Sequence, residues 1–196
     1  MNMELDETHE KIINATFKIL QTEGIEKVTT KKIATEANVN EVTIFRKFKT
    51  KNNLIEVAKE YYVEIFIKKL EDIFDFTGEE EIEEYLNRNF QGILNLSETD
   101  FNLIKITIEE VNGVPEKKSI HTRISNTILG RLESFFKLQV EKGKIRDIDP
   151  KVLSVMCFSM TFQSVVLLRI YDSDQNIDRA AYREGFFDVF FNGIKP

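Results

Sequence analysis

The sequence predicts an all-α fold of about nine helices, in which a small N-terminal domain precedes a larger helical domain. Two observations favour this fold class. Gly and Pro, which interrupt helices, number only 8 and 3 among 196 residues, whereas Lys, Glu, Ile, Leu and Phe are plentiful. Apolar residues also recur at spacings of three and four along most of the chain, which is the helical period.

The first helix is expected from about Thr8 to Glu23, because its apolar positions fall on one face. Gly24 supplies a residue that can end it. The preceding residues 1–7 are polar and acidic, and we expect a frayed end there. This helix is predicted to support its neighbours through its apolar face.

Residues 29–51 predict two short helices joined by a tight turn, followed by the start of a third. Thr29 can cap the first of them, and Asn40 can cap the second. Asn38 tolerates the left-handed conformation that ends many helices. In the second helix Ile44 and Phe48 share a face at i and i+4, which leaves the other side chains free to contact something else.

A short second helix with outward-facing N-terminal residues is the arrangement by which helix-turn-helix proteins enter the major groove of DNA. Polar and cationic side chains of this segment can bond phosphates or bases, and Lys31 and Arg46 can donate to guanine. Phe45 can pack against sugar and backbone. The candidate DNA-binding residues are Thr29, Thr30, Lys31, Asn40, Glu41, Val42, Thr43, Phe45, Arg46, Lys47 and Lys51.

The net charge of −6 argues against a nucleic-acid partner until its distribution is considered. Residues 27–51 hold seven basic and two acidic residues, a net charge of +5, so the rest of the chain carries −11. A local positive segment on an acidic body can meet phosphates while limiting binding elsewhere.

The order of these residues resembles the DNA-binding signature of TetR-family transcriptional regulators over about residues 8–58. The resemblance is carried by residues 29–34, Asn38-Val39-Asn40, Thr43-Ile44-Phe45, Phe48, Lys51 and Leu54, and upstream by Ile12, Ala15, Ile19, Leu20 and Gly24. The family usually has Gly, Gly and Tyr where this chain has Asn38, Val42 and Phe45. Because Val42 changes the groove-facing surface, the operator sequence cannot be transferred from relatives.

The resemblance implies an N-terminal three-helix DNA-binding domain and a C-terminal helical domain for ligand binding and dimerisation. We place the boundary between residues 1–55 and 56–196. It further implies a repressor that leaves a palindromic operator when a small apolar or amphipathic effector binds. The helix that follows the helix-turn-helix is expected over about residues 50–74. By the same resemblance, its movement changes the spacing of the two DNA-binding domains in a dimer.

The helices after this one are expected over about 79–93, 97–111, 120–142, 150–171 and 177–191. Asp75 to Gly78 is the best linker candidate, and Glu79, Glu80 and Glu81 then fall in a first helical turn, where the macrodipole favours negative charge. The stretch 150–171 approaches the roughly 20 residues that span a bilayer. Its polar residues, including Gln163 and Arg169, indicate a buried helix instead.

Two consecutive apolar helices, about 150–171 and 177–191, can pair with the same helices of a second copy to form a four-helix bundle. DNA geometry requires a dimer as well, because a two-fold pair can place two reading helices about 34 Å apart in adjacent major grooves. The resemblance implies an effector cavity in the C-terminal domain, and its lining is assigned from helical facing alone. Its candidate residues are Phe90, Phe101, Ile104, Ile108, Ile124, Ile128, Met156, Met160 and Gln163.

The sequence offers no constellation typical of catalysis, cofactor binding or a metal site. His9 and His121 are far apart, and no phosphate-binding Gly-rich loop, nucleophile elbow or Cys-x-x-Cys pair occurs. The single Cys157 excludes an internal disulfide, and without a signal peptide we expect a cytoplasmic protein. Two alternatives remain: a dimeric DNA-binding protein without an effector, and an all-helical lipid carrier or enzyme.

Overall fold

The computed structural model describes residues 6–110, 120–165, 167 and 178–194. The described residues contain α-helices and one short 3-10 helix and no strand, as the sequence predicts. The chain divides into two compact units, Met1–Phe66 and Ile67–Pro196. This division and the predicted boundary after residue 55 both fall inside one helix, α4 (Lys51–Ile73).

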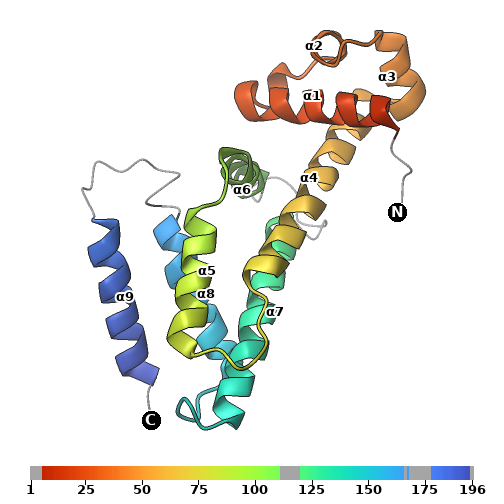
Figure 1. Ribbon diagram of the computed structural model, residues 1–196. Helices are drawn as coiled ribbons and strands as arrows, with labels where there is room; N and C mark the ends of the chain where they lie inside the picture. The colour runs from red at the N-terminus through yellow and green to blue at the C-terminus, as the bar shows by residue number, and fades with distance from the viewer. Residues whose placement is uncertain (1–5, 111–119, 166, 168–177, 195–196) are drawn as a thin grey trace. The chain divides into compact units, whose positions relative to one another are not determined.

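The N-terminal unit contains α1 (Glu7–Glu23), η1 (Ile25–Lys27), α2 (Thr30–Glu36), α3 (Glu41–Phe48) and the first part of α4 (Figure 1). Its core is formed by the apolar faces of all four α-helices. The fully buried side chains include Ile12, Ile13, Phe17, Ile33, Ile44, Phe48 and Leu54. Gly24 ends α1 with a φ of 83°, as expected from its sequence position.

The start of α1 corrects the expectation of a frayed end at residue 6. Asp6 caps the helix, because its side chain accepts a hydrogen bond of 2.9 Å from the amide of His9. The helix therefore begins at Glu7, one residue earlier than expected. Residues 1–5 of the same predicted end lie outside the described residues.

The C-terminal unit contains the rest of α4 and the helices α5 (Ile82–Leu94), α6 (Glu98–Glu110), α7 (Ile120–Glu141), α8 (Pro150–Val165) and α9 (Arg179–Ile194). In Figure 1 the helices α5, α7, α8 and α9 run roughly alongside one another. Stacked aromatic rings lie in the interior. The ring centroids of Tyr85 on α5 and Phe135 on α7 are 3.7 Å apart, and those of Phe90 on α5 and Phe186 on α9 are 6.0 Å apart.

The predicted first turn of α5 is wrong. The three consecutive residues Glu79, Glu80 and Glu81 precede the helix, which begins at Ile82. The Glu80 carboxylate instead accepts hydrogen bonds of 2.9 and 2.8 Å from the amides of Thr77 and Gly78. These bonds close a turn before the helix, so the acidic residues of the first turn are Glu83 and Glu84.

The last two helices also differ from their expected ranges. Within the described residues α8 ends at Val165, and residues 166 and 168–171 of its predicted range lie outside them. The final helix α9 runs three residues beyond the expected end, to Ile194. Among the described residues no helix combines the length and the hydropathy needed to cross a lipid bilayer.

Candidate nucleic-acid interface

The helix α2 begins with the expected cap. The Thr29 hydroxyl accepts a hydrogen bond of 3.2 Å from the amide of Lys32. The next residue, Thr30, donates its hydroxyl to the Glu41 carboxylate at 2.8 Å. Since Thr30 opens α2 and Glu41 opens α3, this bond joins the N-terminal ends of the two helices.

The turn between α2 and α3 has the conformation that its asparagines predict. Asn38 adopts a φ of 52°, in the left-handed region that Asn tolerates better than most residues. The amide of Val39 then donates a hydrogen bond of 2.9 Å to the carbonyl of Ala34. Asn40 caps α3 by accepting a hydrogen bond of 2.9 Å from the amide of Val42. The orientation of α3 is thus fixed by bonds within a few residues.

The helix α3 has two chemically different faces. Ile44 and Phe48 are buried in the core of the N-terminal unit. On the opposite face Val42 is 71 % exposed and Phe45 is 48 % exposed, and the Arg46 side chain is exposed beside them. A helix anchored by one face and open on the other can enter a groove in DNA without unfolding.

The predicted cationic residues fall into two groups. Lys31 on α2 and Arg46 on α3 are exposed, and neither side chain has a partner within the described part of the chain. Lys47 and Lys51, by contrast, are half-buried and engaged. The Lys47 ammonium lies 2.6 Å from the Asp6 carboxylate and 3.2 Å from Nδ1 of His9. The Lys51 ammonium donates to the carbonyl of Val28 at 3.2 Å.

Asp6 is a residue of this site that the sequence did not reveal. Its hydrogen bonds with the Lys47 ammonium and the His9 amide hold the pKa of the carboxyl far below its ordinary value. The only local signal is an acidic residue three positions before His9, which is typical of a helix cap. Nothing local indicates Lys47, which is 41 residues away.

The candidate effector residues lie in different environments of the C-terminal unit. Phe90, Phe101, Ile104, Ile124 and Ile128 are buried as core residues. On α8 Met156 is 50 % exposed, Met160 is 36 % exposed and Gln163 is exposed as well. The side chain of Ile108 lies outside the described residues. The predicted set is therefore divided between the interior and the surface of this single chain.

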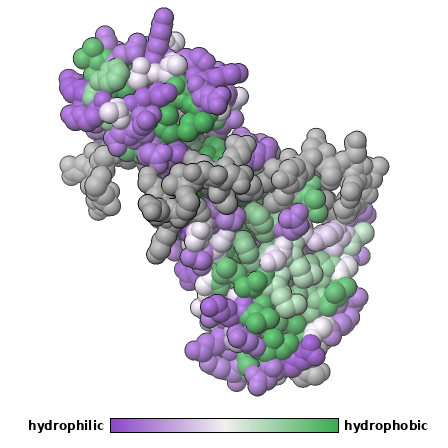
Figure 2. All heavy atoms as spheres, turned by 180° about the vertical axis from the view of Figure 1, so that it is seen from behind, coloured by the Kyte–Doolittle hydropathy of each residue, from purple (hydrophilic) through white to green (hydrophobic). Residues whose placement is uncertain are grey.

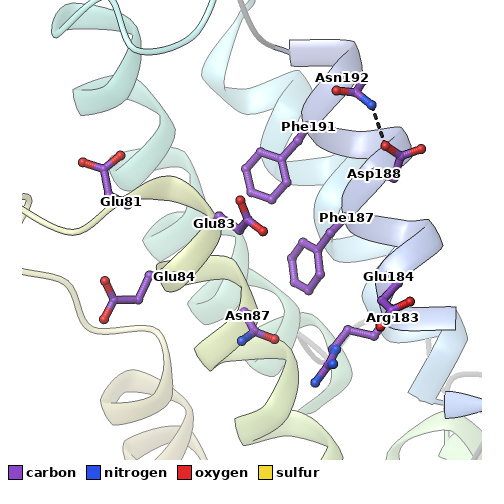
Figure 3. Close-up of a pocket in the computed structure, with 10 residues that line it drawn as sticks. All are labelled: Glu81, Glu83, Glu84, Asn87, Arg183, Glu184, Phe187, Asp188, Phe191 and Asn192. Carbon is purple, nitrogen blue, oxygen red and sulfur yellow. Dashed lines mark hydrogen bonds between the residues drawn. The ribbon is translucent and has the colours of Figure 1, made fainter. Parts of the chain in front are cut away.

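A groove of about 770 Å³ lies between α5 and α9 (Figure 3). Phe187 and Phe191 of α9 point into it, while acidic residues of both helices line its rim. Its lining residues are Glu81, Glu83, Glu84, Asn87, Arg183, Glu184, Phe187, Asp188, Phe191 and Asn192. None of the candidate effector residues is among them. Its charge differs from that expected of a cavity for an apolar effector.

Apolar side chains gather over one face of the C-terminal unit (Figure 2). The exposed apolar residues of α8 follow one another at helical spacing, and one apolar residue of α9 is exposed as well. They are Val152, Val155, Met156 and Met160 of α8 and Val189 of α9. Exposed apolar patches of this kind are typical of interfaces between proteins.

The residues described here offer no group of three or more His, Cys, Asp or Glu side chains that could hold a metal ion. Cys157 is buried, and burial raises the pKa of its thiol to about 12. A thiol in this state is a poor nucleophile, because the thiolate is the reactive form.

The capped α2–turn–α3 arrangement, with one face of α3 anchored and the other open, defines a helix-turn-helix DNA-binding protein. Residues 12–58 match the family of bacterial regulatory proteins named tetR. The N-terminal unit is therefore similar to the DNA-binding part of this family of transcriptional regulators, whose members bind DNA and usually dimerise. The helix-turn-helix and this match support a DNA-binding transcriptional regulator.

Two similar proteins illustrate this assignment at the sequence level. YvkB of Bacillus subtilis, an uncharacterised helix-turn-helix transcriptional regulator, is 47 % identical over 49 residues, which are 25 % of this chain and 26 % of that protein. The nucleoid occlusion factor SlmA of Vibrio atlanticus is 27 % identical over 151 residues, 74 % of this chain and 75 % of that protein.

Solved structures share the fold over nearly the whole chain. A protein of Mesorhizobium loti assigned to the TetR family has a TM-score of 0.77 at 16 % identity, covering 96 % of this chain and 97 % of that one. Salmonella enterica GusR has a TM-score of 0.71 at 17 % identity, covering 97 % of both chains. At these identities the likeness concerns the fold alone.

Proposed function

We propose that this protein is a homodimeric repressor that binds a palindromic operator and leaves it when a small apolar or amphipathic effector binds. The proposal of sequence-specific DNA binding rests on the open face of α3. There Val42, Phe45 and Arg46 are exposed, opposite the buried Ile44 and Phe48. This face belongs to a segment with a local charge of +5. Its charge favours phosphates, and its helix fits the major groove.

The proposed contacts follow from side-chain chemistry and exposure. Lys31 and Arg46, which are exposed and unpaired within the described residues, donate to base edges such as guanine O6 and N7. Thr43 and Lys51 bond phosphates, and Phe45 packs against sugar and backbone. Val42 lies on the open face itself. The remaining members of the proposed interface position the helices or lie at its edge: Thr29, Thr30, Asn40, Glu41 and Lys47.

Dimerisation is proposed through the last two helices, over about 150–171 and 177–191. The exposed apolar side chains of α8 and the exposed Val189 of α9 support this interface, because apolar side chains lose contact with water when two copies pair. Such a pair presents two α3 helices to one duplex. A two-fold symmetric reader requires a palindromic site.

The effector is proposed to bind the C-terminal domain near the predicted residues. It shifts the operator affinity only if it binds the DNA-free spacing of the two heads more tightly than the DNA-bound spacing. The second candidate function is a dimeric DNA-binding protein without an effector. The burial of Phe90, Phe101, Ile104, Ile124 and Ile128 as core favours this alternative, since buried core side chains do not require a ligand.

A selection from random duplexes tests DNA reading. The purified protein is expected to enrich a palindromic sequence and to retard it in gels, with an affinity that falls steeply as salt rises. The double variant K31A/R46A is expected to lose the preference for this sequence. An enrichment no greater than that with an unrelated protein would overturn the proposal.

The effector is tested on the same complex. Apolar and amphipathic compounds that displace a fluorescent apolar dye from the protein are expected to release the selected duplex. If dye binds nowhere and no compound alters the complex, the function without an effector is correct.

A further inference from the structure

The outward face of α3 begins with an apolar side chain where DNA-reading helices offer their first contacts. Val42 is 71 % exposed, the largest exposed fraction among the large apolar side chains of the described residues. It is the second residue of α3. Phe45 and Arg46 follow it at i+3 and i+4 and so lie on the same face. An exposed valine at this place adds nothing to the core, which Ile44 and Phe48 join from the other side.

Two polar groups next to Val42 have partners within the chain. Its own amide donates to the Asn40 side chain at 2.9 Å. The neighbouring Glu41 carboxylate accepts from the Thr30 hydroxyl at 2.8 Å. What the first turn of α3 presents outward at Val42 is therefore a pair of methyl groups. Because valine is branched at Cβ, its χ1 is stiff in a helix and the direction of these methyl groups is set.

The major groove contains one apolar group among the edges of the base pairs, the C5 methyl group of thymine. The other groups exposed there are hydrogen-bond donors and acceptors, which a valine cannot satisfy. We propose that Val42 packs against the C5 methyl group of a thymine in each operator half-site and makes this thymine a requirement of the sequence. This inference rests on the proposed function, because it specifies what the α3 face reads.

The expected loss of affinity follows from the size of the apolar contact. Removing one methyl group from such a contact is expected to weaken binding about fourfold, and removing it from both half-sites about fifteenfold. A hydrogen-bonded base would behave differently, since the loss of a methyl group leaves its donors and acceptors unchanged.

The test uses a duplex selected by the full-length protein from a random pool. Each symmetry-related pair of thymines is replaced by deoxyuridine, which removes only the C5 methyl groups, and the Kd is measured by fluorescence anisotropy. Replacement of one particular pair of thymines is expected to weaken binding about fifteenfold. In V42S the same replacement is expected to change the Kd less than twofold, because the partner of the methyl group is gone.

Ile25 provides a matched control, since it is 52 % exposed in the same unit but lies outside α3. The variant I25S is expected to keep the deoxyuridine effect of the unchanged protein. V42A, which retains one methyl group, is expected to give an intermediate effect. Circular dichroism of the variants reports whether each is folded.

The outcomes separate this inference from the proposed function. If specific DNA binding occurs but no deoxyuridine replacement alters it, or if the effect persists in V42S, the role of Val42 is overturned and DNA reading stands. If no duplex is enriched at all, both are overturned.

Discussion

The ammonium group of Lys47 on α3 lies 2.6 Å from the carboxylate of Asp6, the residue that caps α1. The Lys47 side chain is only 13 % exposed, whereas Asp6 is 57 % exposed. A lysine predicted to neutralise phosphate is therefore already paired within the chain. This pair links the two helices and reduces the positive charge that α3 can offer to DNA.

Replacing Asp6 tests the consequence of this pair. In D6N, Lys47 of each protomer becomes available to a phosphate, so the salt dependence of DNA binding by the dimer is expected to steepen by about two units in log Kd against log salt. Binding at low salt is expected to tighten. The control is E7Q, which removes the same charge from the adjacent residue, whose partner is Lys11. Equal salt slopes in D6N and E7Q would show that the pair does not restrain Lys47.

Arg46 is expected to carry sequence preference. The variant R46A should weaken binding to the selected operator about 5- to 150-fold for each half-site and relax the preference at one base pair per half-site. Competition between operator variants measures both effects. R146A serves as the control, because Arg146 is also exposed but belongs to the C-terminal unit. A uniform loss across all sequences would assign Arg46 to phosphate instead.

The apolar patch on α8 is expected to hold the dimer. M156E places a charge among Val152, Val155 and Met160, and burial of an unpaired charge is costly. The protein is expected to become monomeric in sedimentation equilibrium and to lose tight operator binding. I65E is the control, because Ile65 on α4 is similarly exposed at 46 %, and the I65E protein should remain dimeric. A dimeric M156E protein would exclude this face as the interface.

Local chemistry explains which features could be predicted from the sequence. The caps Thr29 and Asn40 and the left-handed Asn38 each depend on groups within a few residues, and the structure confirms all three. The pairing of Asp6 with Lys47 depends on tertiary packing across 41 residues, which no local pattern reports.

The surface of α8 could not be predicted for a different reason. This helix is apolar around most of its circumference, so the helical period does not distinguish the buried side from the exposed one. The helical period therefore predicts Met156 and Met160 as cavity residues without distinguishing the two sides of the helix, and both are exposed in the single chain. The helical first turn predicted at Glu79–Glu81 is wrong for a related reason, because a carboxylate can accept hydrogen bonds from the amides of a turn as well as from those of a helix.

Glu80 makes the stability of the turn before α5 depend on pH. Burial alone would raise the pKa of its carboxyl, but the hydrogen bonds from Thr77 and Gly78 outweigh it and lower the pKa to about 2. The stability from the ionised form is fully present above about pH 5 and is lost as the pH falls towards 2.

The variant E80Q is therefore expected to be less stable than the unchanged protein by roughly 1–2 kcal/mol at pH 7, and to approach it in stability at low pH. Urea unfolding between pH 7 and pH 3 measures this difference. E79Q should behave like the unchanged protein, since Glu79 is 89 % exposed. A difference between E80Q and the unchanged protein that stays constant with pH would contradict the assignment.

Cys157 is expected to be inert in the folded protein. Its side chain is 4 % exposed, and burial raises the pKa of the thiol to about 12. Labelling with a thiol reagent at pH 8 should be at least a hundredfold slower than in urea, where the thiol is accessible. A cysteine introduced at the exposed Glu133 of α7 gives the reference rate in the folded state. Rapid labelling of Cys157 in the native protein would contradict the packing of α8.

Hydroxyl-radical footprinting of the full-length protein on its selected duplex tests the central claim most directly. Two α3 helices of one dimer are expected to protect two patches on the same face of the DNA, with centres about 34 Å, or one helical turn, apart. The K31A/R46A variant should lose both patches together. A single protected patch, or two patches on opposite faces of the duplex, would contradict a two-fold reader built on α3.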